Sequence, residues 1–279
     1  KRWRLTDCLI IDEVSMLNPE LFDMLENVAR IIRKNDKPFG GIQLILSGDF
    51  LQLPSIGTDT FVFQSDTWKK CIKNIFYLTE IFRQTDVKFQ QCLSEIRLGN
   101  ITKDIEDTLS SRINADVGKF GIKPTKLFSL NQDVSRINEE ELEKFRKEGR
   151  KFNEYKMDLA CKEYTYEIEK FVKNCPAVSI LKLCVGAQVM LLRNIDLELG
   201  MANGSRGVVV DFETIRNLPV VKFMNGHTDI ISYISWTYKT NNGEEVSLSQ
   251  IPLKVAYALT IHKCQGSSLD CVELDLTNI

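Results

Sequence analysis

The sequence predicts an α/β protein built on a parallel sheet, and three segments near its start support that prediction. Residues 8–11 form a short continuous apolar run, which is typical of a strand buried on both faces of a parallel sheet. Residues 18–36 show helical spacing, and residues 42–46 form a second apolar run. Strand, helix and strand in this order predict a βαβ unit, whose ligands bind at the carboxyl ends of the strands.

The predicted helix of this unit has a defined start and stop. Asn18 is a good N-cap, and Pro19 suits the first helical position because its missing N–H has no partner there in any case. Lys37-Pro38 ends the segment. The residues that share its predicted apolar face recur at helical spacing and are Leu21, Leu25, Val28 and Ile32.

The rest of the chain changes character twice. Residues 77–152 are polar and mostly helical in pattern. From residue 181 short β-rich runs with intervening Gly and Asn predict a small β-barrel or hairpin insertion; the runs are 185–192, 207–211 and 218–223. Two later runs, 255–261 and 271–276, are predicted to return to the α/β core.

Composition excludes several classes of protein. The 279 residues carry 36 Lys plus Arg against 38 Asp plus Glu. The chain therefore has no net positive charge with which to bind nucleic acid, and any such binding needs a local basic groove. No apolar run approaches the roughly 18 residues of a membrane span, and no membrane partner is expected. Eight cysteines without a C-x-x-C pair predict no zinc site but reduced, mostly buried thiols.

Polar residues follow both predicted strands of the βαβ unit. Asp12 and Glu13 come after the first strand, as in the Walker B pattern, although two acids at a strand end are also common without any function. Residues 48–54 follow the second strand and begin with Gly-Asp. Their Gln52 can bond a phosphate oxygen and a water, whereas an ordinary proline-terminated turn is the structural alternative.

These motifs resemble the Pif-family DNA helicases, which are superfamily 1B motors related to RecD. The matching segments follow the family's order over nearly the whole chain: DEVSM at 12–16, PFGG at 38–41, GDFLQLP at 48–54, LTEIFRQ at 78–84, EIRLGN at 95–100, LFSLNQDVSRINEEEL at 127–142, VGAQVMLLRN at 185–194, NGSRGVVV at 203–210 and YALTIHKCQGSSLDCVELDL at 257–276.

The resemblance implies an α/β fold of two RecA-like P-loop NTPase motor domains, the first truncated, with an SH3-like β insertion in the second. The implied ranges are 1–80 for the first motor domain, 81–200 with 251–279 for the second, and 201–250 for the insertion. Trp236 of that insertion is expected to pack in a core or to stack on a base.

Site residues are implied position by position, beginning with the nucleotide. Asp12 would hold Mg²⁺, and Glu13 would position or activate the attacking water. Gln52 would sense the γ-phosphate of ATP and couple it to bound DNA. Arg83 would act as an arginine finger supplied in cis, although by itself it is more simply read as the partner of Glu80 in a surface ion pair.

The string at 260–266 implies a further set of contacts. Gly266 would lie near the nucleotide. His262, Lys263 and Ser267 would face the DNA strand, with phosphate contacts and base stacking as the mode of binding. His262 taken alone is more often a packed, hydrogen-bonded residue than a ligand.

The implied function is ATP-dependent, 5′-to-3′ unwinding of DNA, with ATP and Mg²⁺ as cofactors and single-stranded and forked DNA as partners. A monomer is expected, in nucleus, mitochondrion or cytoplasm, and a viral origin is not excluded. A non-hydrolysing nucleic-acid-binding remnant of the fold is the alternative. The chain has no G-x-x-x-x-G-K-[ST] P-loop and no arginine after Arg216 for motif VI, so we expect a fragment that is inert as an ATPase by itself.

Overall fold

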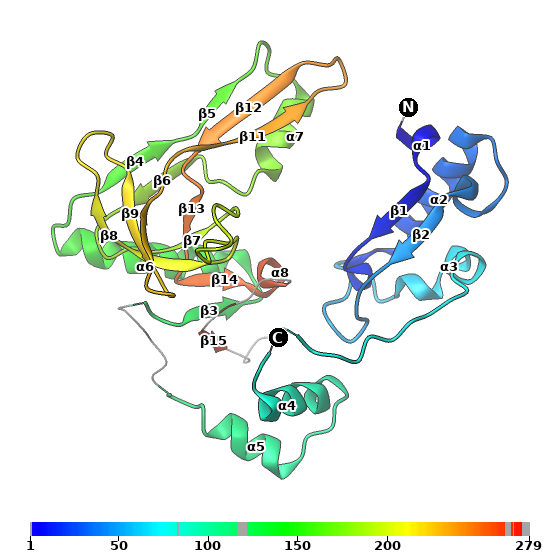
Figure 1. Ribbon diagram of the computed structural model, residues 1–279, viewed down its shortest axis with the longest axis horizontal. Coiled ribbons are helices and arrows are strands. Elements are labelled where there is room, and N and C mark those ends of the chain that lie inside the picture. Colours follow the sequence, from blue (N-terminus) through cyan, green and yellow to red (C-terminus); the bar gives the residue numbers. More distant parts are fainter. Residues whose placement is uncertain (1, 83, 116–121, 266–268, 270, 275–279) are drawn as a thin grey trace. The chain divides into compact units, whose positions relative to one another are not determined.

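The computed structural model divides the chain into two compact units, Lys1–Ala115 and Asp116–Ile279, and each is described by itself. Figure 1 shows the elements of both units along the chain. The described residues are 2–82, 84–115, 122–265, 269 and 271–274.

The first unit is built on a two-stranded parallel sheet. β1 (Cys8–Ile11) pairs with β2 (Gln43–Leu46), and α2 (Pro19–Arg33) connects them, which confirms the predicted βαβ unit. The remaining elements of this unit are short helices and 3₁₀ turns: α1 (Arg2–Leu5), Val14–Met16, Pro38–Gly41, Val62–Gln64, α3 (Asp66–Cys71), α4 (Val87–Arg97) and α5 (Lys103–Ser110).

The start of α2 is the predicted one. The Asn18 side chain accepts hydrogen bonds from the backbone N–H groups of Glu20 and Leu21, and Pro19 occupies the first helical position. The helix ends at Arg33, before the predicted stop at Lys37-Pro38. Lys34 takes the left-handed conformation there, with φ of 52°, and ends the helix as a C-cap.

The buried face of α2 differs from the predicted one. Phe22 and Ala29 are fully buried, whereas Leu21 is 44% exposed. The ring of Phe22 packs 5.2 Å from that of Phe39, which lies in the turn before β2. Because an aromatic ring buries more apolar area than leucine, this contact sets the rotation of the helix about its axis.

The prediction that the first strand is buried on both faces is wrong. Leu9 and Leu44 pack toward the core of the unit, but Cys8 is exposed and Ile10 is 66% exposed. Ile45, on the neighbouring strand, is 46% exposed. Side chains alternate between the two faces of a strand, so one face of this sheet is covered and the other is bare.

The second unit contains a three-stranded parallel sheet in the order β14-β3-β15. β3 (Thr125–Phe128) is central, and β14 (Ala258–Thr260) and β15 (Val272–Leu274) flank it. The helix α6 (Asn131–Lys147) packs on β14, and the short helix α8 (Ile261–Cys264) follows β14 directly. The predicted return of the late strands to an α/β core is thus confirmed.

Antiparallel strands make up most of the rest of this unit. Their sheets have the orders β10-β9-β8-β7-β13, β11-β12-β5 and β4-β6. This arrangement confirms the predicted β-rich texture. The elements are β4 (Asn153–Lys156), β5 (Asp158–Ala160), α7 (Tyr166–Asn174), β6 (Ile180–Leu183), β7 (Gln188–Leu191), β8 (Arg206–Phe212), β9 (Pro219–Phe223), β10 (Thr228–Ile230), β11 (Ile234–Lys239), β12 (Glu245–Gln250) and β13 (Leu253–Val255).

The strands inside 201–250 pair with strands outside that range. β8 pairs with β7, and β12 pairs with β5, so the predicted insertion is hydrogen-bonded to its surroundings on two sides. The domain ranges implied by the resemblance, including the SH3-like character of 201–250, stay a prediction.

None of the eight cysteines, all of which lie within the described residues, is joined in a disulfide bond. Only Cys92 and Cys184 are buried, so the prediction that most of them are buried is wrong. Within the described residues, no helix combines the length and the apolar character that a membrane crossing requires.

Candidate nucleotide edge and candidate nucleic-acid groove

The turn after β1 carries the two predicted acids. Asp12 is exposed, and its Oδ1 accepts a hydrogen bond of 2.9 Å from the backbone N–H of Glu13. Glu13 is half-buried and takes the left-handed conformation, with φ of 51°, before the 3₁₀ turn Val14–Met16. A non-glycine residue in that region costs roughly 1–3 kcal/mol, and such residues gather at functional sites.

The loop after β2 touches this turn. The backbone N–H of Val14 donates to the carbonyl of Ser47 at 2.9 Å, which continues the pairing of β1 with β2. A Cβ atom at Gly48 would lie 2.7 Å from the backbone nitrogen of Val14, and φ of Gly48 is +156°. Only glycine therefore allows the two loops to approach this closely.

Asp49 organises the loop after β2. The Arg97 side chain donates from Nε to Oδ2 at 2.7 Å and from Nη2 to Oδ1 at 2.9 Å. The backbone N–H of Leu51 and the Nε2 of Gln52 also donate to this carboxylate, at 3.1 Å each. The hydrogen bonds from Arg97 are the main cause that lowers the pKa of Asp49 below its usual value.

Three predicted residues, Asp12, Glu13 and Gln52, thus lie in the loops at the carboxyl edge of β1 and β2. Arg83 lies outside the described residues. Mg²⁺ prefers oxygen ligands and is usually held by one or two carboxylates together with phosphate oxygens and water. The exposed carboxylate of Asp12 fits that role. Within the described residues, no cluster of three or more His, Cys, Asp or Glu side chains forms a self-sufficient metal site.

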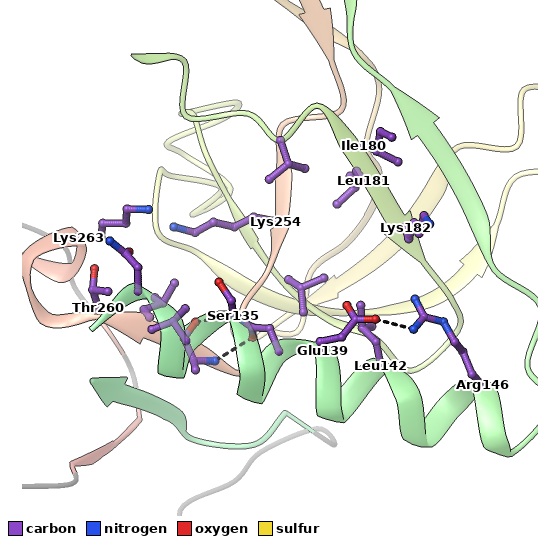
Figure 2. A pocket seen from close by; sticks show the side chains of 17 residues that line it. Ser135, Glu139, Leu142, Arg146, Ile180, Leu181, Lys182, Lys254, Thr260 and Lys263 are labelled. Atoms are coloured by element: carbon purple, nitrogen blue, oxygen red, sulfur yellow. Dashed lines mark hydrogen bonds and ion pairs between the residues drawn. The ribbon is translucent and has the colours of Figure 1, made fainter. Parts of the chain in front are cut away.

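A groove of about 310 Å³ lies in the second unit. Figure 2 shows that α6 forms its floor and that β6, β13 and α8 contribute side chains from the other sides. Polar side chains from α6 and β14 line it, among them Asn131, Ser135 and Thr260.

The groove is basic at one end. Its basic side chains are Arg146, Lys182, Lys254 and Lys263. The first two have carboxylate partners, but Lys254 and Lys263 form no ion pair with any residue that the structure describes. Figure 2 shows both of these amines at the α8 end of the groove. Burial, and next the charge of Lys263, lower the pKa of Lys254. An anion bound here would relieve that repulsion.

The outcome for the other predicted DNA contacts is mixed. Lys263 lines the groove, and its contact with DNA stays a prediction. His262 is half-buried on the same helix and does not line the groove, so its role stays a prediction. Gly266 and Ser267 lie outside the described residues. Trp236, on β11, is half-buried, so core packing and base stacking both stay predictions for it.

Sequence reasoning missed Arg97 and Lys254. Arg97 lies in the EIRLGN segment at 95–100, but its pairing with Asp49 has no local signal, because Asp49 lies 48 residues earlier in the chain. Lys254 does have one, since it is the single charged residue in the apolar run 251–261. A lone lysine among strand-forming apolar residues is rarely buried without a reason.

Comparison with known proteins matches the chain to one family. The family profile "PIF1-like helicase" matches residues 1–107, and "DNA helicase Pif1, 2B domain" matches residues 169–212. The ATP-dependent DNA helicase PIF1 of Xenopus laevis is 42% identical over 284 residues, covering 100% of this chain and 44% of that protein. The chain thus spans less than half the length of this curated relative.

Solved structures agree over the whole chain. The crystal structure of Pif1 helicase from Candida albicans is 32% identical, with a TM-score of 0.77, and the match covers 100% of this chain and 68% of that one. Pif1 from Bacteroides sp in complex with ADP-AlF4 is 29% identical, with a TM-score of 0.79, over 98% of this chain and 65% of that one. The Bacteroides helicase bound to single-stranded DNA matches with a TM-score of 0.60, 30% identity and the same coverage of each chain.

Proposed function

Because the chain belongs to the Pif1 helicase family, we propose that it forms part of an ATP-driven DNA helicase. The observation that carries the proposal is the contact between the loops at 12–16 and 48–52. Gly48 permits that contact, and it brings Asp12, Glu13 and Gln52 to the carboxyl edge of two adjacent parallel strands. Ligands of open α/β sheets bind at this edge.

In the proposed reaction each of the four residues that the resemblance implies has one task. Asp12 would hold Mg²⁺, and the ion would supply positive charge to offset that of the ATP phosphates. Glu13 orients the attacking water and accepts its proton. Gln52 contacts the γ-phosphate, and Arg83 stabilises the charge on the transferred phosphoryl group. The Bacteroides relative was crystallised in complex with ADP-AlF4, which supports a nucleotide as the ligand in this proposal.

The groove of the second unit is the proposed DNA interface. Lys254 and Lys263 present positive charge without carboxylate partners in the described part of the chain, and backbone phosphates of single-stranded DNA would supply the missing counter-charge. The single-stranded DNA complex of the Bacteroides relative supports this choice of ligand. The 5′-to-3′ direction of unwinding rests on the family resemblance alone.

The proposal is tested with Glu13→Gln in the longest natural polypeptide that contains this sequence. The amide keeps the shape of the side chain but cannot accept the proton, so we expect ATP to bind while DNA-stimulated turnover falls roughly 10²–10⁴-fold. Glu20→Gln, at an exposed position on α2, is the matched control and should leave turnover unchanged. Near-normal turnover in the Glu13 variant would remove Glu13 from the mechanism. A wild-type protein that binds DNA but never hydrolyses ATP would favour the non-hydrolysing alternative.

A further inference from the structure

Neighbouring donors occupy all the hydrogen-bond acceptor positions of the Asp49 carboxylate. Its Oδ1 accepts from Leu51 and from Arg97, and its Oδ2 accepts from Gln52 and from Arg97. A carboxylate offers about four acceptor positions, so these four donors occupy all of them. Asp49 therefore has no lone pair left for a metal ion or a substrate, and its task is to hold its donors in place.

The side chain of Arg97 is half-exposed, and its backbone is held by the end of a helix. It is the last residue of α4, and the turn that follows is closed by hydrogen bonds from the N–H groups of Gly99 and Asn100 to the carbonyls of Ile96 and Glu95. The guanidinium meets the carboxylate through two parallel hydrogen bonds, which fix its orientation as well as its distance. A lysine cannot reproduce this geometry, because its ammonium is a point charge.

The pair thus joins two parts of the first unit that are distant in sequence. One is the loop after β2, where the exposed amide of Gln52 is held by Asp49. The other is α4, which begins at Val87, separated by two residues from the segment 78–84 that contains Arg83. The hydrogen bonds from Arg97 to Asp49 and from Gln52 to Asp49 thus form a continuous chain of contacts from α4 to the Gln52 side chain.

We propose that Arg97 is a positioning residue of the helicase cycle, which holds the Gln52 amide in its working orientation through the Asp49 carboxylate and links it to α4. The inference rests on the proposed function, in which Gln52 contacts the γ-phosphate. Arg97 itself touches neither nucleotide nor DNA in this scheme. Its loss should consequently affect turnover and its stimulation by DNA, rather than the affinity for ATP.

The test is a double-mutant cycle in the longest natural polypeptide that contains this sequence. We expect Arg97→Ala to lower DNA-stimulated kcat roughly 10- to 100-fold, the size of effect that a small misplacement of a reacting group produces, with KM for ATP changed less than about 3-fold. In a Gln52→Ala background the same change should have no further effect, because the group it positions is already gone. Arg112→Ala, at an exposed position in the same unit, is the matched control.

Two outcomes would overturn the inference. One is an Arg97→Ala protein with normal DNA stimulation, and the other is an effect that simply adds to that of Gln52→Ala. If the alanine variant does not fold, Arg97→Lys replaces it in the test, because lysine keeps the charge and the aliphatic chain but lacks the forked guanidinium. A lysine variant with wild-type coupling would also refute the proposal. Glu13→Gln, purified and assayed in parallel, distinguishes failure of this inference from failure of the proposed function. An inert wild type or an active Glu13 variant would contradict the proposed function and not the role of Arg97.

Discussion

Asn138 joins helix α6 to the edge of the parallel sheet in the second unit, and its loss should loosen that edge strongly. Its Oδ1 accepts from the N–H groups of Tyr257 and Ala258, at 2.9 and 3.0 Å, and its Nδ2 donates to the carbonyl of Ala258 at 3.0 Å. The side-chain amide thus takes the place of a neighbouring strand. Asn138→Leu keeps a similar volume but leaves three buried backbone groups without partners.

The expected cost follows from those three groups. Each buried backbone group left unpaired costs about 1–3 kcal/mol, and the groove beside Asn138 lets water relieve part of this, so we expect about 3 kcal/mol in total. Native-state hydrogen exchange of peptides containing 257–258 measures it directly. Because 1.4 kcal/mol is a factor of ten, protection should fall roughly 100-fold.

Two further variants make this experiment decisive. Asn131→Leu, an exposed position on the same helix, should change protection by less than about 0.5 kcal/mol. Asn138→Asp keeps the acceptor but turns an oxygen toward the carbonyl of Ala258, so its cost should be intermediate. If Asn138→Leu costs no more than Asn131→Leu, the amide does not hold the strand and the reasoning is wrong.

Three other measurements address the charged groups and the chain itself. Lys254→Ala and Lys263→Ala should each reduce the dependence of single-stranded DNA affinity on log salt by about 0.7, the value for one phosphate contact, as measured by fluorescence anisotropy. Arg97 lowers the pKa of Asp49 in the folded state, so the ionised Asp49 carboxylate should stabilise the fold. This contribution should be complete above the unfolded pKa near 3.8 and should disappear as pH falls through the lower folded pKa. The urea midpoints of wild type and Asp49→Asn should therefore converge at that low pH. The 279-residue chain holds no P-loop sequence and should release no phosphate from ATP, even with Mg²⁺ and DNA present.

Local signals in the sequence predicted the parts of the fold that depend on neighbouring residues. The cap at Asn18, the two strands and the order strand, helix, strand all follow from patterns within about 40 residues, and the structure confirms them. The rotation of α2 could not be predicted in the same way. It depends on Phe39, which lies outside the helix and packs against Phe22, so that Phe22 is buried and Leu21 is not.

The candidate sites show the same division. Asp12, Glu13 and Gln52 are visible in the sequence because each follows a strand of a recognisable motif. The partner of Asp49 is not visible, because Arg97 approaches it only after the intervening chain has folded. The groove is equally hidden, since α6 and β13 meet across more than a hundred residues of sequence.

The pairing of β3 also sets an order of events during synthesis. β3 ends at Phe128, and its neighbours in the sheet, β14 and β15, begin at Ala258 and Val272. At roughly 5–20 residues per second, a ribosome needs about 6–26 s to make the intervening chain. Throughout that interval β3 has no strand partner among the described residues already made. The antiparallel sheets can form meanwhile, so the parallel sheet that supports α8 is the last part of this unit to close, and until then β3 is available to chaperones or to aggregation.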